Sequence, residues 1–102
     1  MKYTKAIRDR IPEIIREFGE DCKVEILDDA VFLEEMEKKL REEVEEYLSS
    51  KSPVELADVI EVIYRIVELR KMSLEELDQI RLEKKEKRGG FKKNLFLVEI
   101  YS

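Results

Sequence analysis

The sequence predicts a mainly α protein with a single domain covering residues 1–102. Apolar residues recur at three- and four-residue spacing through 29–48 and 53–71, which is the period of an amphipathic helix. Only four residues, 49–52, separate these stretches, so they should form an antiparallel helical hairpin, followed by a third long helix. Both hairpin helices are apolar over a wide arc, and a chain this short buries little of its own surface. We therefore expect a homo-oligomer, a dimer or a tetramer, packed like a four-helix bundle.

The first quarter of the chain predicts a short helix and a short strand. Ile11, Ile14, Ile15 and Phe18 recur on one helical side, with a proline in the first turn and Gly19 as the stop. The stretch 22–27 alternates weakly between polar and apolar residues, which favours a short strand. An aspartate, at position 28 or 29, should cap the first hairpin helix, which runs to about residue 48.

Serine caps mark the next two helices. Ser52, Pro53 and Glu55 form a capping box with a first-turn proline, and the helix they open should end near residue 71. Ser73 and Glu76 form a second capping box, which opens a helix ending near residue 88, before two glycines. The terminal stretch 94–101 is rich in apolar and aromatic residues and predicts a strand that could pair with 23–27.

Composition excludes several functional classes. Charged residues make up 44% of the chain, but 20 basic against 25 acidic residues leave a net charge of -5, so we expect no nucleic-acid partner. The chain has no histidine, which removes Ser-His or Cys-His catalysis, histidine zinc sites and histidine-ligated di-iron centres. One cysteine, no signal peptide and no apolar run of membrane-spanning length predict a cytoplasmic protein with no membrane contact.

Four acidic residues occupy unusual positions on the two hairpin helices. At about 100° per residue, Glu43 falls inside the apolar arc of its helix and Glu55 in the middle of the other arc. Glu46 and Asp58 lie at the edges of these arcs. Counting outward from the turn places Glu46 opposite Glu55, and Glu43 opposite Asp58 one helical turn further out. The neighbouring Glu42 points toward solvent.

Four converging carboxylates need a compensating charge, because burial and mutual repulsion both disfavour the ionised forms. A hard divalent cation supplies it, and Mg²⁺ prefers oxygen ligands while keeping waters and phosphates in its shell. The pattern therefore predicts a Mg²⁺ site, with Mn²⁺ as a substitute. A simpler interpretation stands beside it for each residue alone: Glu55 is also explained as the capping-box partner of Ser52, and Glu46 as a solvated residue near a helix end.

The acidic pattern resembles a known family. "LREEVEEYL" contains Glu-Glu-x-x-Glu, and "ELAD" contains Glu-x-x-Asp. Together they resemble the signature of the MazG-like all-α nucleoside triphosphate pyrophosphatases, which share a superfamily with phosphoribosyl-ATP pyrophosphohydrolase. "IRDRIPEII" and "RGGFKKNLFLVEI" resemble the flanks of small single-domain members, so the resemblance covers almost the whole chain. The spacer of eight residues between Glu46 and Glu55 is shorter than the family pattern. A second Glu-x-x-Asp, at Glu75 and Asp78, is rejected because it lies one helix away.

The resemblance implies a Mg²⁺-dependent hydrolase that cleaves a nucleoside triphosphate between the α- and β-phosphates, in nucleotide-pool house-cleaning. Glu43, Glu46, Glu55 and Asp58 would then be the catalytic metal ligands. Two alternatives stay open: phosphoribosyl-ATP pyrophosphohydrolase, with the same chemistry on another substrate, and a non-catalytic helical interaction protein whose acids keep it soluble.

Basic residues near both ends of the chain could hold the outer phosphates of such a substrate. The candidates are Arg8, Arg10, Lys84, Lys87, Arg88, Lys92 and Lys93. Cations at 84–88 also suit the C-terminal end of a helix dipole, which is the commoner reason for them. Phe91, Phe96 and Tyr101 could stack on the base, although such residues are more often core or subunit contacts.

Overall fold

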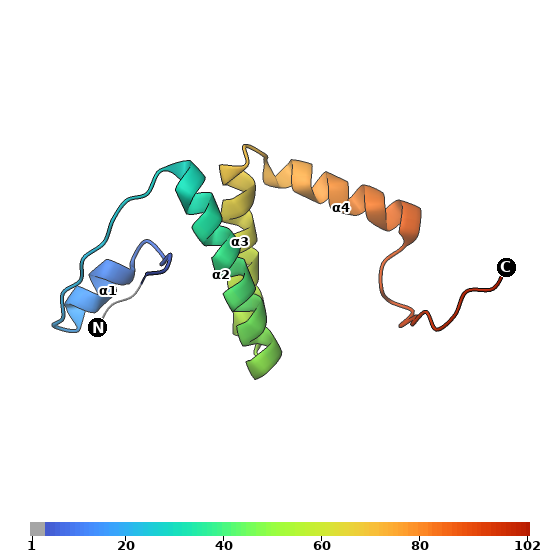
Figure 1. Ribbon diagram of the computed structural model, residues 1–102, viewed down its shortest axis with the longest axis horizontal. Helices are drawn as coiled ribbons and strands as arrows, with labels where there is room; N and C mark the ends of the chain where they lie inside the picture. Colours follow the sequence, from blue (N-terminus) through green and yellow to red (C-terminus); the bar gives the residue numbers. More distant parts are fainter. Residues whose placement is uncertain (1–3) are drawn as a thin grey trace.

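The structure is a computed structural model that describes residues 4–102, and these residues form four helices (Figure 1). Their bounds are α1 Ile11–Glu17, α2 Asp29–Ser50, α3 Pro53–Leu69 and α4 Leu74–Arg88. The mainly α prediction is confirmed, and each predicted helix is present to within about three residues of its expected ends.

Short polar side chains begin three of the helices. Asp28 accepts a hydrogen bond from the Val31 N–H at 2.9 Å and so caps α2. Ser52 caps α3 in the same way, and Ser73 accepts from the Glu76 N–H at 3.1 Å at the start of α4. These bonds satisfy backbone donors that have no partner inside the helix. The local sequence thus fixes where each helix starts.

α2 and α3 lie antiparallel and side by side, as the short turn predicts (Figure 1). Lys51 follows the last residue of α2, and its left-handed backbone (φ 59°) turns the chain directly into the cap of α3. The core of the hairpin is small. It consists of Met36, Val62 and Leu69 with Ala6 from the N-terminal segment, surrounded by partly buried Phe32, Leu33, Leu40 and Ile66.

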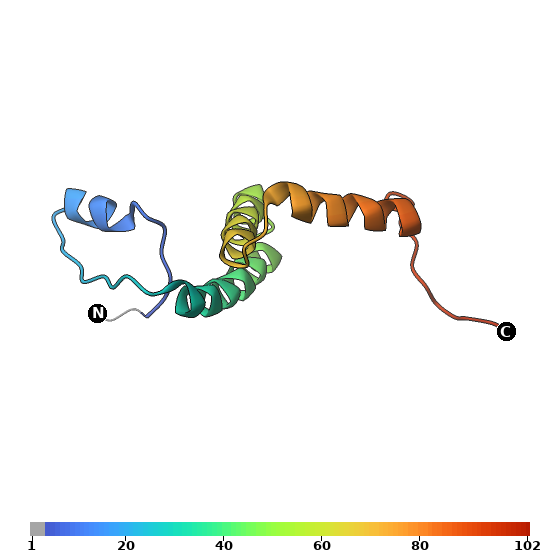
Figure 2. The ribbon, with the colours of Figure 1, turned by 90° about the horizontal axis from the view of Figure 1, so that it is seen from above.

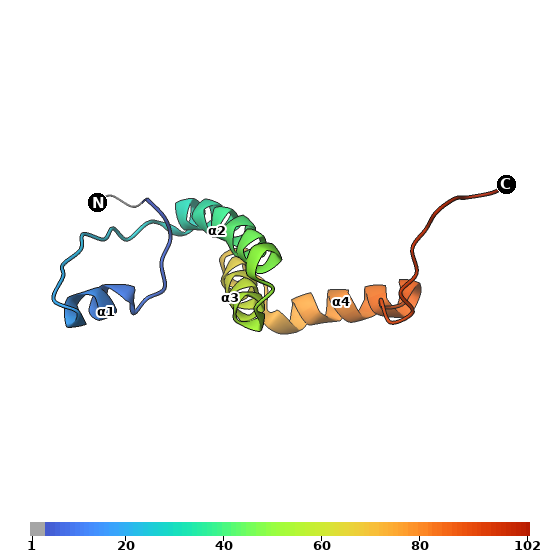
Figure 3. The same ribbon diagram turned by 90° about the horizontal axis from the view of Figure 1, so that it is seen from below.

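α1 and α4 lie on opposite sides of the hairpin in all three views (Figure 1, Figure 2, Figure 3). Among residues 4–102, α1 packs against no other helix, and α4 contacts only the end of α3. The radius of gyration is 18.3 Å and the longest dimension 64 Å. A compact domain of this length has a radius of gyration of about 13 Å. A single chain therefore leaves much of its apolar surface uncovered.

The two strands expected at 22–27 and 94–101 are not formed, so that part of the prediction is wrong. Neither stretch pairs with the other or with any other segment in the described part of the chain. Both are extended and largely exposed, with Ile26 fully exposed and Phe96 nearly so. A strand is stable only when a neighbour satisfies its backbone groups, and here the two stretches leave the hairpin on opposite sides (Figure 1).

No helix within residues 4–102 is both long enough and apolar enough to cross a membrane.

Candidate metal centre

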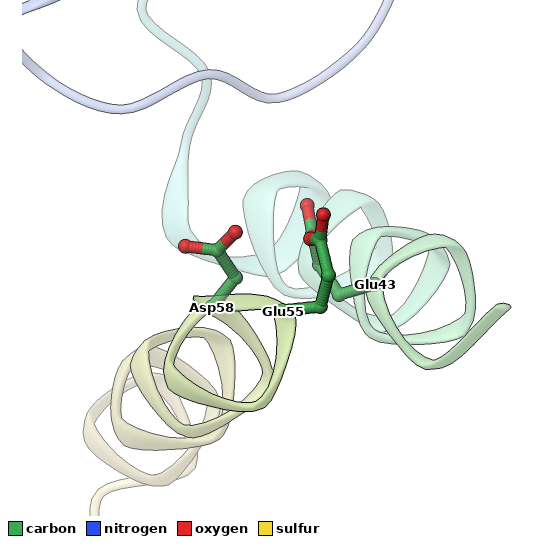
Figure 4. A group of neighbouring side chains, drawn as sticks. All are labelled: Glu43, Glu55 and Asp58. Atoms are coloured by element: carbon green, nitrogen blue, oxygen red, sulfur yellow. The ribbon is translucent and has the colours of Figure 1, made fainter. Parts of the chain in front are cut away.

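Three of the four predicted ligands meet in the structure. Glu43 from α2 and Glu55 and Asp58 from α3 each place a carboxylate oxygen within 4.8 Å of the other two. Their side chains point to the same side of the hairpin (Figure 4). Glu55 and Asp58 are three residues apart on one helix and therefore share a face, and the antiparallel turn sets Glu43 opposite them.

Glu43 is the only buried charged residue in the described part of the chain. Its Oε2 atom is inaccessible to solvent and has no hydrogen-bond partner. Its Oε1 atom lies 3.7 Å from the Lys39 ammonium, one helical turn earlier on α2. Such a buried oxygen without a partner costs about 1–3 kcal/mol. A ligand that reaches Oε2 would therefore relieve an existing penalty.

The charges of the cluster oppose one another. Burial raises the pKa of Glu43 above its usual value, and the nearby carboxylates Glu46 and Asp58 raise it further against the opposing effect of Lys39. Desolvation also raises the pKa of Glu55, followed by repulsion from Glu46 and hydrogen bonding with the Glu46 carboxyl. Both carboxyl groups therefore hold their protons more tightly than free glutamate does.

Glu46 lies at the edge of this cluster. It is exposed and does not belong to the group of three whose oxygens converge. Its influence on the pKa of Glu55 places it next to that residue, which is the pairing that counting from the turn predicts. The structure thus gives a close set of three carboxylates with a fourth at its rim.

The capping-box explanation of Glu55 is wrong. Ser52 does cap α3, by accepting from the Val54 N–H at 3.3 Å. The return bond would run from the Ser52 N–H to the Glu55 carboxylate. That N–H instead donates to the Ser50 Oγ atom at 3.1 Å. Glu55 is therefore free of the cap, and its carboxylate lies with Glu43 and Asp58.

One of the predicted phosphate-binding cations reaches the cluster. Arg8 donates from Nη2 to Asp58 Oδ1 at 2.8 Å, from the N-terminal segment that passes beside the hairpin (Figure 4). Arg10 does not reach it, because it pairs with Glu13 at 2.9 Å on α1. Lys39, which lies 3.7 Å from Glu43, is not among the cations predicted from the sequence. Its position four residues before Glu43 on the same helix is a signal that could have identified it.

The remaining predicted cations lie on the far part of the chain. Lys84, Lys87 and Arg88 line a shallow cavity of about 330 Å³ along α4, together with Ile80 and Glu83. Arg88 also borders a second cavity, of about 280 Å³, which is lined by residues 88–93 and Leu95. α4 leads away from the carboxylates, so none of these cations joins them within one chain (Figure 1).

The aromatic candidates for base stacking are also distant from the cluster. Phe91, Phe96 and Tyr101 belong to the C-terminal segment and are almost fully exposed, so they are not core residues of the single chain. Glu42 lies near Lys39 at 4.0 Å and is half exposed, in agreement with its predicted solvent-facing position. Asp78 pairs with Arg81 on α4, which agrees with the rejection of the second Glu-x-x-Asp.

The donor set suits a hard divalent cation. All of its donors are carboxylate oxygens, one of them buried and without a partner, and Mg²⁺ binds such oxygens together with water.

Comparison of the chain with protein-family models, with curated proteins and with solved structures finds no match.

Proposed function

We propose that this protein is a Mg²⁺-dependent nucleoside triphosphate pyrophosphohydrolase, which cleaves between the α- and β-phosphates to give a monophosphate and pyrophosphate. The observation that carries the proposal is the buried Glu43, whose Oε2 atom lacks a partner and which lies within 4.8 Å of Glu55 and Asp58. The reaction class rests on the resemblance of the acidic motifs and both flanks to the MazG-like pyrophosphatases.

A carboxylate that is buried at this position needs a cation to compensate its negative charge. Lys39 lies near only one of the Glu43 oxygens, and Arg8 forms an ion pair with Asp58. Glu43, Glu55 and Asp58 would hold the metal ion, and Glu46 at the rim would hold a metal-bound water or a second ion. Mg²⁺ in such a site supplies charge neutralisation for the phosphates and makes a bound water more acidic.

The protein's own residues supply the remaining requirements. The acidic cluster cannot attract a triphosphate without compensation, so cationic side chains must neutralise the oxygens that the metal ion leaves free. Arg8 is placed for this role, because its guanidinium is more than half exposed and already lies beside Asp58. One carboxylate of the cluster would accept the proton of the attacking water during hydrolysis.

The experiment that tests the proposal is a product analysis. The purified chain is incubated with Mg²⁺ and a panel of ribo- and deoxyribonucleoside triphosphates and with phosphoribosyl-ATP, and the products are separated. We expect monophosphate and pyrophosphate from at least one nucleotide, with loss of at least a hundredfold in rate in Glu43→Gln, on the scale of removing a metal ligand. Glu42→Gln, one residue away but facing solvent, is the matched control and should retain activity.

Three results would contradict or narrow the proposal. Nucleoside diphosphate and inorganic phosphate as products would mean that cleavage occurs between the β- and γ-phosphates, which contradicts the proposal. Turnover of phosphoribosyl-ATP alone would keep the chemistry and change the substrate. A protein that hydrolyses none of these compounds and gains no stability from millimolar Mg²⁺ would favour the helical interaction protein.

A further inference from the structure

The cation-rich end of α4 cannot serve the acidic cluster of its own chain in this structure. α4 starts at the end of α3 that is opposite the hairpin turn, whereas the cluster lies close to the turn (Figure 1). From Asp58 to the end of α3 the rise is about 16 Å, and α4 then runs about 22 Å further in a different direction. The most basic segment of the chain therefore projects away from the most acidic one.

The two segments are complementary in charge. Residues 84–93 carry six cations and one glutamate, and residues 42–61 carry seven acids and one lysine. Both segments are well exposed: the cations line shallow cavities along α4 and the glycine turn, while Glu42, Glu46 and Glu61 lie in solvent. When one surface of a chain is positive and another is negative, the two can meet between copies. Such pairing favours association and fixes how the copies are aligned.

Apolar surface accompanies these charges. The hairpin exposes large side chains on both helices, and α4 and the C-terminal segment expose more: Val44, Leu48, Leu56, Ile60, Ile80, Leu82, Phe91, Leu95, Phe96, Leu97, Val98 and Ile100. On the helical wheel, Val44 and Leu48 of α2 share the hairpin face of Leu56 and Ile60, opposite the carboxylates. That face can pack against the same face of a second copy, in a symmetric contact.

We propose that a second copy of this chain completes the site. The basic end of α4 and the glycine turn of each copy lie against the acidic cluster of the other copy. The hairpins pack through their apolar faces, and α4, about 22 Å long, spans the thickness of two packed helices at about 10 Å each. Lys87 and Arg88 of one copy then hold the outer phosphates of a substrate bound at Glu43, Glu55 and Asp58 of the other. This inference rests on the proposed pyrophosphohydrolase activity.

The shared arrangement supplies the positive charge that the site of a single chain lacks. A site with four carboxylates and a triphosphate needs more positive charge than one metal ion and Arg8 supply. The chain has these cations but presents them outward, next to apolar residues that need covering. Sharing the site between copies satisfies both requirements at once. Folding of α4 back onto its own hairpin is the competing arrangement, and the experiment below separates the two.

The test is complementation between two inactive variants. One chain carries Glu43→Gln and keeps its cations, and the other carries Lys87→Ala with Arg88→Ala and keeps its acids. Each alone should lose at least tenfold in rate. After subunit exchange of equal amounts, half the dimers are mixed and each contains one intact site, so the rate should recover to about a quarter of the wild-type value. Lys38→Ala with Arg41→Ala, two exposed cations on α2, is the matched control and should keep full activity.

The outcomes separate the two proposals. A wild type that releases no pyrophosphate overturns the proposed function. A wild type that does, with no recovery in a mixture shown by native mass spectrometry to contain mixed dimers, overturns the shared site and favours folding back within one chain. Full activity of the Lys87→Ala, Arg88→Ala chain also overturns it.

A second measurement does not depend on activity. Lys87→Glu with Arg88→Glu should weaken self-association in sedimentation velocity, and so should Glu42→Lys with Glu61→Lys. Mixing the two charge-reversed chains should restore association, because each then meets a complementary surface. Self-association that is unchanged in both variants would contradict the proposal.

Discussion

Arg8 and Asp58, fifty residues apart in the chain, are joined by a 2.8 Å hydrogen-bonded ion pair that ties the N-terminal segment to the acidic cluster. In the absence of metal, Arg8 supplies Asp58 with a compensating positive charge. Arg8 is therefore a structural partner of the hairpin and, like Lys39, a cation that adjoins the cluster.

The first prediction concerns Arg8. Arg8→Ala should lower kcat/KM for the triphosphate by roughly tenfold, because a charge-assisted hydrogen bond to phosphate is lost. The effect on the free energy of unfolding should stay below about 1 kcal/mol, since the pair is largely exposed. Steady-state kinetics and chemical denaturation measure the two effects. Arg10→Ala is the control, because Arg10 pairs with Glu13 outside the cluster; equal losses in both variants would contradict a specific role for Arg8.

The second prediction concerns stability without metal. Glu43→Gln should raise the free energy of unfolding by about 1 kcal/mol at neutral pH in the presence of a chelator, because the net environment of Glu43 disfavours its charge. The melting temperature should rise by about 4–8 °C for a domain of this size. Circular dichroism on heating measures it. Glu42→Gln should change little, and a destabilised Glu43→Gln would mean that Lys39 outweighs the repulsion.

The third prediction follows from the sign of the pKa shifts. The pKa values of Glu43 and Glu55 are raised in the folded state, so the stability these groups contribute is fully present below the unfolded value of 4.5 and is lost as pH rises through the folded pKa. The advantage of Glu43→Gln over the wild type should therefore be largest at neutral pH and disappear toward pH 4.5. Chemical denaturation of the two metal-free proteins across this range measures it, and an advantage that grew on acidification would contradict the assignment.

The fourth prediction concerns the metal ion. Mg²⁺ at a hundredfold excess over its dissociation constant should stabilise the wild type by about 2.7 kcal/mol and leave Glu43→Gln nearly unaffected. The stabilisation should fall as pH is lowered, since protons compete for the carboxylates with raised pKa values. Thermal melts with and without Mg²⁺ give the shift directly. An equal shift in both proteins would place the bound ion elsewhere.

The fifth prediction concerns the turn. Ser50→Ala removes the acceptor of the Ser52 N–H, which would then be available to the Glu55 carboxylate. Closing this capping box should draw Glu55 away from the cluster and weaken Mg²⁺ binding several-fold, with little loss of helix content. Isothermal titration measures the affinity. Ser49→Ala, at the preceding exposed position, is the control; unchanged affinity in Ser50→Ala would show that Glu55 stays with the cluster regardless of the cap.

Local sequence was sufficient for the helices and for one feature of the site. Capping residues and apolar periodicity act over a few positions, so Ser52 and Ser73 could be assigned as helix starts directly, and Asp28 as one of two adjacent candidates. The same periodicity placed Glu43 inside an apolar arc, and the structure buries it. A short turn between two such helices leaves only an antiparallel arrangement, which sets Glu55 and Asp58 of α3 opposite Glu43 of α2.

The tertiary structure decided the rest, because the deciding contacts are either between distant residues or between competing local partners. The Ser52 N–H donates its hydrogen bond to the Ser50 Oγ atom and not to the Glu55 carboxylate. Residue spacing alone does not decide between these two acceptors. The Arg8 to Asp58 pair depends on the path of the N-terminal segment, and Arg10 two residues later turns to Glu13 instead. The strands expected at 22–27 and 94–101 lack partners, since pairing is a property of two segments and these two leave the hairpin on opposite sides (Figure 1).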